Sequence, residues 1–257
     1  MEDNTQLGSV TQTIQNGIAT VTFEHPAHNS MPGNLLAKLA NTITALGSNA
    51  EAKVIILKSA GARTFCAGAS FDELMSIEDF DIGHTFFMGF ANVINACRKC
   101  PKLIIGRVQG KAVGGGVGLA SATDYCLATK FASIKLSELA VGIGPFVVGP
   151  AVERKIGNSA MTQLAFDATS WRTAEWATQK GLYANIYDST ELLDEAVFVL
   201  ATKLAASNPE AMTEMKKAFW SGTENWDTLL SERAAVSGKL VLSAYTKNAI
   251  AKFKSKA

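Results

Sequence analysis

Two short segments, residues 53–58 and 102–108, constrain the fold of this chain most strongly, because each contains a run of apolar residues. Each run is bounded by polar residues, as expected of a strand that is covered on both faces. Residues 77–98 lie between the runs and have helical periodicity, while residues 125–128 and 133–136 predict further short strands. Strands that alternate with helices predict an α/β domain with a mainly buried sheet.

The two ends of the chain have different patterns. Residues 10–14 and 18–23 alternate apolar and polar side chains around Asn16-Gly17, which predicts a β-hairpin. From residue 189 onward the periodicity is almost entirely helical. We therefore predict a core domain at residues 1–188 and a helical C-terminal region at residues 189–257.

Composition disfavours several classes of function. The 24 Lys and Arg residues nearly balance 23 Asp and Glu residues, so a formal charge of +1 gives no long-range field that would attract nucleic acid or an anionic membrane. Apolar stretches such as residues 196–201 are far shorter than the roughly 20 residues of a membrane helix. The polar start does not resemble a signal peptide, and four cysteines in 257 residues point to a reducing cytoplasm. We expect neither nucleic acid nor a membrane as partner.

Residues 114–116 are three consecutive glycines that follow an apolar strand segment and open a short helical segment. They leave the backbone bare on one side, so a ligand atom can reach peptide N–H groups at the positive end of a helix dipole. The pattern predicts an anion or oxyanion site, and a flexible turn or a close strand–helix contact fits it equally well. A second cluster, residues 64–74, also runs into a helix start, with Ser70 as candidate N-cap and Glu73 three residues later.

Glu138 is the best candidate for a general base in the chain. Its neighbours Leu136, Leu139 and Val141 are apolar. We therefore expect a partly desolvated carboxylate, whose pKa is raised from about 4.3 and which is a stronger base when ionised. A surface glutamate at the end of a strand is the alternative interpretation.

Other chemistries have less support. Cys97 and Cys100 have C-x-x-C spacing, but a second pair at a zinc-like interval is missing, so we expect no metal site. None of the three histidines lies beside a serine in a nucleophile-elbow context. The main rival is dinucleotide binding, because residues 116–121 copy part of G-x-G-x-x-G and Glu138 follows about 20 residues downstream. Ser121 stands in place of the third glycine.

Taken in order, five landmarks resemble the enoyl-CoA hydratase/isomerase (crotonase) family over nearly the whole chain. They are residues 28–31, 65–69, 108–116 and 137–138, and Ala174 with Gly181-Leu182. The resemblance implies a ClpP/crotonase-like spiral of ββα units with a helical C-terminal region that forms trimers, usually paired into hexamers. It also implies a coenzyme A thioester as substrate and no separate cofactor, because coenzyme A is part of the substrate.

The resemblance places the oxyanion hole at the backbone N–H groups of Ala69 and Gly115, which agrees with the interpretation of both glycine-bearing loops. One well-aimed donor to the developing oxyanion is typically worth roughly 3 to 4 kcal/mol. Family members often hold the phosphates with a basic residue in the first loop, where this chain has His25 and His28. The further substrate contacts that the resemblance implies are Ala67, Gly68, Phe71, Gly114, Phe146, Phe253 and Lys256, with Lys252 and Lys254 as additional candidates for the phosphates.

The chain lacks one of the two acidic residues that are typical of the family's hydratases. Hydratases typically carry a glutamate two residues after the glycine triplet and another at the position of Glu138, whereas here the first place is Gly118. A single carboxylate resembles the Δ3,Δ2-enoyl-CoA isomerases, in which it takes a proton from C2 or C4 and returns it to the other carbon. Phe146 stands where hydratases usually have a small glycine near the water site.

A double-bond shift is therefore the leading prediction. Hydration of an enoyl-CoA, including a branched one similar to methylglutaconyl-CoA, is the alternative, and non-catalytic acyl-CoA binding is a third interpretation. Decarboxylation, dehalogenation and other enolate chemistry would use the same oxyanion hole.

Overall fold

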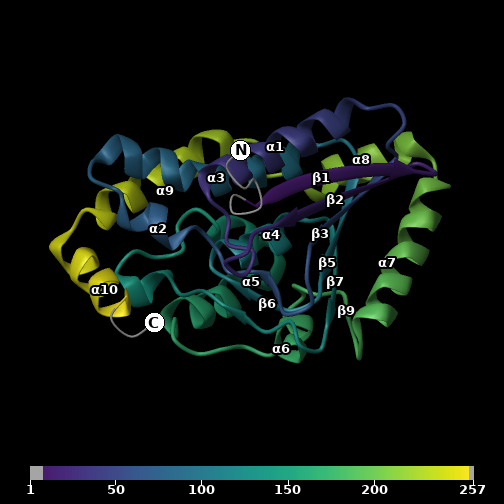
Figure 1. Cartoon of the computed structure of the whole chain (residues 1–257). Helices are drawn as coiled ribbons and strands as arrows, with labels where there is room; N and C mark the ends of the chain where they lie inside the picture. The colour runs from purple at the N-terminus through teal and green to yellow at the C-terminus, as the bar shows by residue number, and fades with distance from the viewer. Residues whose placement is uncertain (1–7, 255–257) are drawn as a thin grey trace, which may run out of the picture.

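A six-stranded sheet with the order β1-β2-β3-β5-β7-β9 forms the centre of the computed structural model, which describes residues 8–254 (Figure 1). β1 (Ser9–Gln15) and β2 (Ile18–Glu24) pair as an antiparallel hairpin. Asn16 and Gly17 both have positive φ, as a tight two-residue hairpin turn requires. The other strands pair in parallel: β3 (Val54–Ser59), β5 (Leu103–Val108), β7 (Tyr125–Thr129) and β9 (Asn185–Tyr187). The predicted hairpin and the predicted buried strands are confirmed.

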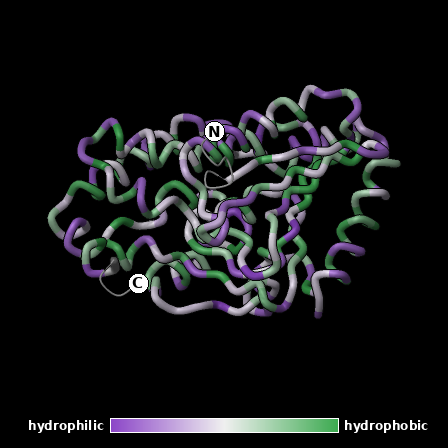
Figure 2. The backbone as a smooth tube through the Cα atoms, viewed as in Figure 1, coloured by the Kyte–Doolittle hydropathy of each residue, from purple (hydrophilic) through white to green (hydrophobic). Residues whose placement is uncertain are grey.

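Each face of this sheet is covered by helices. α1 (Gly33–Ser48) and α3 (Phe80–Lys99) lie over one face, and α7 (Thr190–Ala205) lies against the other (Figure 1). The residues of β3 are continuously apolar because both faces of the strand are buried. Ile55 and Leu57 belong to the main core, while Ile56 belongs to the cluster under α7. The hydropathy colouring accordingly shows apolar segments along the strands and polar ones at the turns (Figure 2).

A second, three-stranded parallel sheet has the order β4-β6-β8. It consists of β4 (Thr64–Cys66), β6 (Lys111–Val113) and β8 (Ile134–Lys135). Each strand has at least one residue that is fully buried in the main core and fixes the sheet there, namely Phe65 and Cys66, Ala112, and Ile134. Since the strands are parallel, their carboxyl ends meet at one edge.

The remaining helices follow these strands or form the C-terminal region. They are α2 (Phe71–Met75), α4 (Gly115–Ala122), the 3-10 turn η2 (Glu138–Val141), α5 (Gly149–Phe166), α6 (Ala174–Gln179), α8 (Pro209–Phe219), α9 (Trp226–Val241) and α10 (Ala244–Lys254). α9 packs along α3, and α10 packs against η2. Within residues 8–254, none of the helices combines the length and apolar character needed to cross a bilayer.

The predicted helix at residues 77–98 begins slightly later than expected. Asp79 ends the preceding loop in an extended conformation, and its Oδ1 accepts a hydrogen bond from the backbone N–H of Ile82 at 2.8 Å. A capping aspartate satisfies an amide that has no partner within the helix. α3 therefore starts at Phe80.

A buried ion pair fastens α8 to the start of β7. Lys216 is 3% exposed and lies 2.9 Å from Oδ2 of Asp124, and its ammonium group also donates to the carbonyl oxygen of Lys102 at 2.8 Å. Oδ1 of the same aspartate accepts from Nε1 of Trp220 at 2.7 Å. Every polar atom in this group is thus matched, and removal of one member leaves a charge without its partner.

Substitution Lys216→Met should lower the free energy of unfolding by about 3 kcal/mol, because it strands the Asp124 carboxylate in a nearly dry site. Urea denaturation followed by circular dichroism measures this loss. Lys217→Met is the matched control on the same helix, since Lys217 is exposed and pairs with exposed Glu214, and it should change stability by less than about 0.5 kcal/mol. Equal losses in the two variants would contradict the prediction.

Candidate active site

The segments that follow β4 and β6 lie against each other. A Cβ atom on Gly68 would lie 3.0 Å from the carbonyl oxygen of Val113 and 3.6 Å from the amide nitrogen of Gly115. Gly68 has a φ of +96° and Gly114 a φ of +51°, conformations that residues with side chains rarely adopt. Both the close approach and the backbone angles therefore require glycine at these positions.

Hydrogen bonds of the neighbouring carbonyl groups fix the direction of two amides. The carbonyl oxygen of Gly68 accepts from Met31 N at 2.8 Å, and that of Gly114 accepts from Val117 N at 2.9 Å inside α4. In a trans peptide the N–H points opposite to the C=O. The N–H of Ala69 therefore points away from Met31, and the N–H of Gly115 points away from Val117. Within residues 8–254, neither N–H donates one of the backbone hydrogen bonds that join loops and helix caps.

Glu138 lies at the same edge, directly after β8. Its Oε1 is 3.0 Å from the position that a Cβ atom on Gly114 would take. The residue as a whole is half-buried, but its Oε2 is shielded from solvent and lacks a hydrogen-bond partner within the described chain. Burial raises the pKa of this carboxyl from 4.5 to about 7. The expected desolvation is thus present, and the carboxylate lies beside the Gly114–Gly115 peptide.

The structure gives a physical reason for the missing second acid. A Cβ atom on Gly118 would lie 2.5 Å from Cγ1 of Val148, a side chain that is 4% exposed. A glutamate at this position would collide with Val148 unless the start of α5 moved. Phe146 is half-buried just beyond η2, and its ring lies over Gly144, where a Cβ atom would come within 2.7 Å of it.

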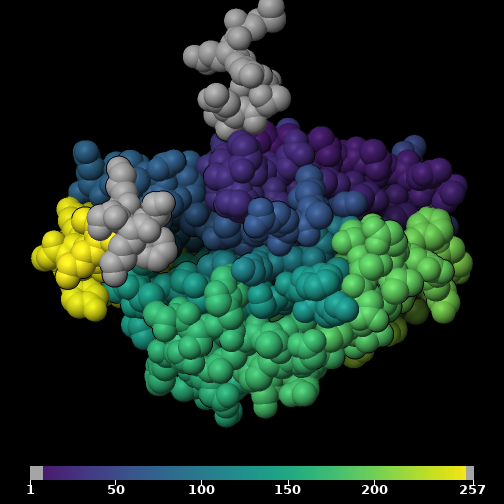
Figure 3. Space-filling view, turned by 60° about the horizontal axis from the view of Figure 1, so that its bottom comes forward, coloured from purple at the N-terminus to yellow at the C-terminus, as the bar shows by residue number. Residues whose placement is uncertain are grey.

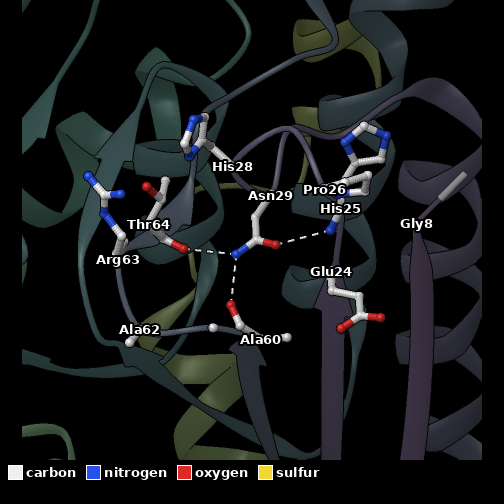
Figure 4. A pocket seen from close by; sticks show the side chains of 11 residues that line it. Gly8, Glu24, His25, Pro26, His28, Asn29, Ala60, Ala62, Arg63 and Thr64 are labelled. Carbon is white, nitrogen blue, oxygen red and sulfur yellow. Dashed lines mark hydrogen bonds between the residues drawn. The ribbon is translucent and has the colours of Figure 1, made fainter. Parts of the chain in front are cut away.

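A pocket of about 440 Å³ opens between the loop after β2 and the loop after β3, at the amino end of β4 (Figure 4). Buried Asn29 joins the two loops, because its amide accepts from His25 N at 3.0 Å and donates to the carbonyl oxygens of Ala60 and Thr64 at 2.9 and 2.8 Å. No local pattern in the sequence indicates this role for Asn29. Its backbone has a positive φ of +56°, a conformation that asparagine adopts more readily than most residues.

Two histidines, one arginine and one glutamate, Glu24, contribute side chains to the pocket. His28 and Arg63 are exposed at its border, and His25 is half-buried in its wall (Figure 4). The same loop connects to the first glycine-bearing segment, since the carbonyl oxygen of His28 accepts from Ala67 N at 3.2 Å. Sequence analysis did not single out Arg63, and a single exposed arginine in a loop carries no sequence signal that distinguishes it.

Other residues named from the sequence are placed as follows. Phe71 is the first residue of α2 and is half-buried, and Ser70 caps that helix by accepting from Glu73 N at 3.3 Å. Lys252 is exposed on α10. Lys256 and the side chains of Phe253 and Lys254 lie outside the described part of the chain.

Two alternative chemistries do not fit the structure. Residues 116–121 are all buried inside α4, so a dinucleotide has no access to them. Cys97 and Cys100 are free thiols buried at the end of α3, and burial raises the pKa of Cys97 to about 12. Across the described residues, His, Cys, Asp and Glu side chains do not gather in groups of three or more that would hold a metal ion.

Comparison with known proteins identifies the family. The family model "Enoyl-CoA hydratase/isomerase" matches residues 13–256. The chain belongs to the enoyl-CoA hydratase/isomerase family.

Relatives within this family carry different activities. A (7aS)-7a-methyl-1,5-dioxo-2,3,5,6,7,7a-hexahydro-1H-indene-carboxyl-CoA hydrolase of Mycobacterium tuberculosis is 30% identical over 80% of this chain and 82% of its own length. A short-chain-enoyl-CoA hydratase of Clostridium acetobutylicum is 27% identical over 96% and 95% of the two chains. The crystal structure of an enoyl-CoA hydratase from Bacillus halodurans superimposes with a TM-score of 0.87 at 22% identity, over 95% of this chain and 99% of that chain. The predicted crotonase fold is thus confirmed, and at these identities the names do not select one reaction.

The raised pKa of Glu138 predicts a dependence of stability on pH. Between about pH 4.5 and 7 the native state keeps a proton that the unfolded chain has released, so stability falls as pH rises through this window. The variant Glu138→Gln should therefore gain up to about 3 kcal/mol over the wild type on going from pH 4 to pH 8. Parallel urea titrations at the two pH values measure this difference, with Glu195→Gln on the exposed face of α7 as control. Identical pH profiles for Glu138→Gln and wild type would contradict the prediction.

Proposed function

We propose that this protein is an acyl-CoA enzyme that shifts the double bond of an enoyl-CoA thioester with one carboxylate base. The observation that carries the proposal is the shielded carboxylate of Glu138, which lies against Gly114, the residue whose peptide bond carries the Gly115 N–H. A base beside an oxyanion hole is what proton abstraction next to a thioester carbonyl requires.

In the proposed reaction the thioester oxygen accepts hydrogen bonds from the N–H groups of Ala69 and Gly115. Glu138 takes a proton from C2 of a 3-enoyl-CoA, and the electron pair of the C–H bond moves into a dienolate whose negative charge rests on the thioester oxygen. The protonated Glu138 then returns the same proton to C4, which leaves the double bond between C2 and C3. Substrate and product have the same atoms, so neither water nor a redox partner is consumed.

The electrostatics suit this cycle. A base with a pKa near 7 is substantially ionised at neutral pH, and it remains acidic enough to return its proton after the first step. The oxyanion donors are main-chain groups held by α4 and by the Gly68 carbonyl bond, so they need no rearrangement when charge develops. Gly114 and Gly118 as glycines keep side chains away from the reacting carbons.

Hydration is the second candidate, because a relative that aligns along nearly the whole chain is a short-chain-enoyl-CoA hydratase. Water addition divides its work between a base and an acid, and Val148 fills the space that a second acid at position 118 would need. The bulk of Phe146 beyond η2 also reduces the room for a nucleophilic water. These two side chains favour the double-bond shift.

The nucleotide half of the thioester is proposed to lie at the pocket of Figure 4. Arg63 offers a charge and His28 a ring nitrogen to phosphate groups there, and exposed Lys252 on α10 is a further candidate. Assembly into a homotrimer or homohexamer is part of the proposal. Large exposed side chains such as Phe166 and Phe198, which are 76% and 61% exposed, are suited to subunit contacts.

Substitution Glu138→Gln should lower kcat for isomerisation of trans-3-hexenoyl-CoA by at least about 1,000-fold, because the amide cannot take the proton. The absorbance of the conjugated 2-enoyl thioester measures isomerisation, and chromatography of 3-hydroxyacyl-CoA measures hydration. Calorimetric binding of hexanoyl-CoA should persist in the variant. If the wild type hydrates the substrate at a rate comparable with double-bond migration, the protein is a hydratase. If turnover is near background in both the wild type and the variant, the protein is a non-catalytic acyl-CoA binder.

The pH dependence of the same reaction provides an independent check. Because the base must be ionised, kcat/KM should fall about tenfold for each pH unit below an apparent pKa near 7 and should level off above it. Initial rates between pH 5 and 9 in buffers of constant ionic strength give this profile. A rate that stays constant down to pH 5 would exclude Glu138 as the rate-controlling base.

A further inference from the structure

We infer that the acyl group accepted by this site is an uncharged hydrocarbon chain, and that thioesters with a carboxylate at the far end of the acyl chain are rejected. This inference rests on the proposed acyl-CoA function and names the substrate class within it. Three observations support it: the side chains around Glu138, the path from the oxyanion amide, and the distribution of charge in the surrounding segments.

An apolar cluster adjoins the base. Val141 belongs to η2, and Ile143 is tied to the same turn because its N–H donates to the carbonyl oxygen of Glu138 at 3.0 Å. α2 and α3 contribute to the cluster from one side, and α9 and α10 from the other. Its buried members are Ile77, Ile143, Val241 and Ile250, and its partly buried members are Phe71, Leu74, Met75, Phe86, Phe87, Val141 and Leu242.

α3 connects this cluster with the oxyanion edge. Phe90 packs on the backbone of Gly115, where a Cβ atom would collide with its ring. One turn earlier, Phe86 and Phe87 meet edge to face at 5.0 Å and belong to the apolar cluster. A chain that leaves a thioester carbonyl held at Gly115 and follows α3 therefore runs past aromatic rings into the cluster.

Part of this apolar surface is available to a ligand. None of the five residues of α2 is fully buried, and Phe71, Leu74 and Met75 are each half-exposed. Figure 3 shows the C-terminal helix, in yellow, beside the blue segment that contains the start of α3. An acyl chain of several CH₂ groups would cover this surface, and each buried CH₂ group would strengthen binding.

The segments on the α2, α3 and η2 side of the cluster lack Lys and Arg. Residues 64–97 contain five Asp and Glu residues and not one Lys or Arg, and residues 136–152 also contain neither Lys nor Arg. The one histidine of these segments, His84, turns toward α9, where its Nε2 lies 3.3 Å from both the carbonyl and the hydroxyl oxygen of Ser231. The lysines on the facing helices, Lys239, Lys247 and Lys252, are exposed to solvent.

A terminal carboxylate would thus enter an apolar environment beside the base, with no Lys or Arg in residues 64–97 or 136–152 to pair with it. An ion that is removed from water without a partner is strongly disfavoured, and like charges increase that penalty. A terminal methyl group at the same place gains free energy from burial. The site therefore separates two chains of equal length by the charge of their last group.

Competition binding with hexanoyl-CoA and adipoyl-CoA tests the inference directly, because these saturated thioesters differ only in a terminal methyl or carboxylate and need no turnover. We expect hexanoyl-CoA to bind at least about 30-fold more tightly to the wild-type protein at pH 8, by calorimetry with free CoA as reference. Affinities within about threefold of each other would overturn the inference. If CoA binds and both thioesters bind no better than CoA, the inference is overturned while the nucleotide half of the proposed function stands.

A pair of variants locates the effect. Leu74→Lys places a cation on the half-exposed side of the cluster. It should reduce the preference for hexanoyl-CoA over adipoyl-CoA by at least about tenfold. Ser76→Lys adds the same charge two residues away at an exposed position, and it should leave the preference unchanged. If both substitutions reduced the preference for hexanoyl-CoA equally, the assignment of this cluster as the binding surface of the acyl chain would be overturned. If Leu74→Lys does not fold, the wild-type comparison decides the inference alone.

Discussion

The carboxyl ends of β4, β6 and β8 lie at one edge of a parallel sheet, and each strand is followed within three residues by one part of the proposed catalytic machinery. β4 leads to Gly68 and Ala69, β6 leads to Gly114 and Gly115, and β8 leads to Glu138. The buried residue of each strand holds its end in the core, so the positions of the two amides and the carboxylate are fixed by backbone pairing rather than by flexible side chains. Loss of register in this small sheet would separate all three.

The same arrangement creates a conflict between stability and chemistry. The Glu138 carboxylate has been removed from water without a hydrogen-bond partner for Oε2 in the described chain, which is unfavourable for folding at neutral pH. A carboxylate that is poorly solvated is also a stronger base toward a substrate C–H group. The fold compensates through its two large apolar cores, and the local cost is retained where a reactive group is needed. Val148 contributes to this environment by packing on Gly118, which keeps a second carboxylate out of the site.

The sequence predicts those parts of the structure whose signal is local. The hairpin at Asn16-Gly17 and the doubly buried strands β3 and β5 follow from alternation and from continuous apolar runs. β4 and β6 were missed because three residues are too few to show a period, and α5 because Gly157 has a non-helical conformation inside it. In the candidate site the glycines and Glu138 are recognisable from their chemistry. Phe90, Val148 and Asn29 act through contacts with segments distant in sequence, and no local pattern indicates such contacts.

The C-terminal helices, which sequence periodicity describes only as a helical region, are physically connected to the base. Thr246 of α10 is fully buried, and its hydroxyl donates to the carbonyl oxygen of Gly142 at 3.0 Å. Gly142 has a φ of +82°, and a Cβ atom there would lie 2.7 Å from that same hydroxyl, so glycine is required for the contact. η2 is therefore held between β8 on one side and α10 on the other. Because the base and the apolar side chains beside it rest on this turn, the position of the last helix bears on both the proton transfer and the choice of acyl group.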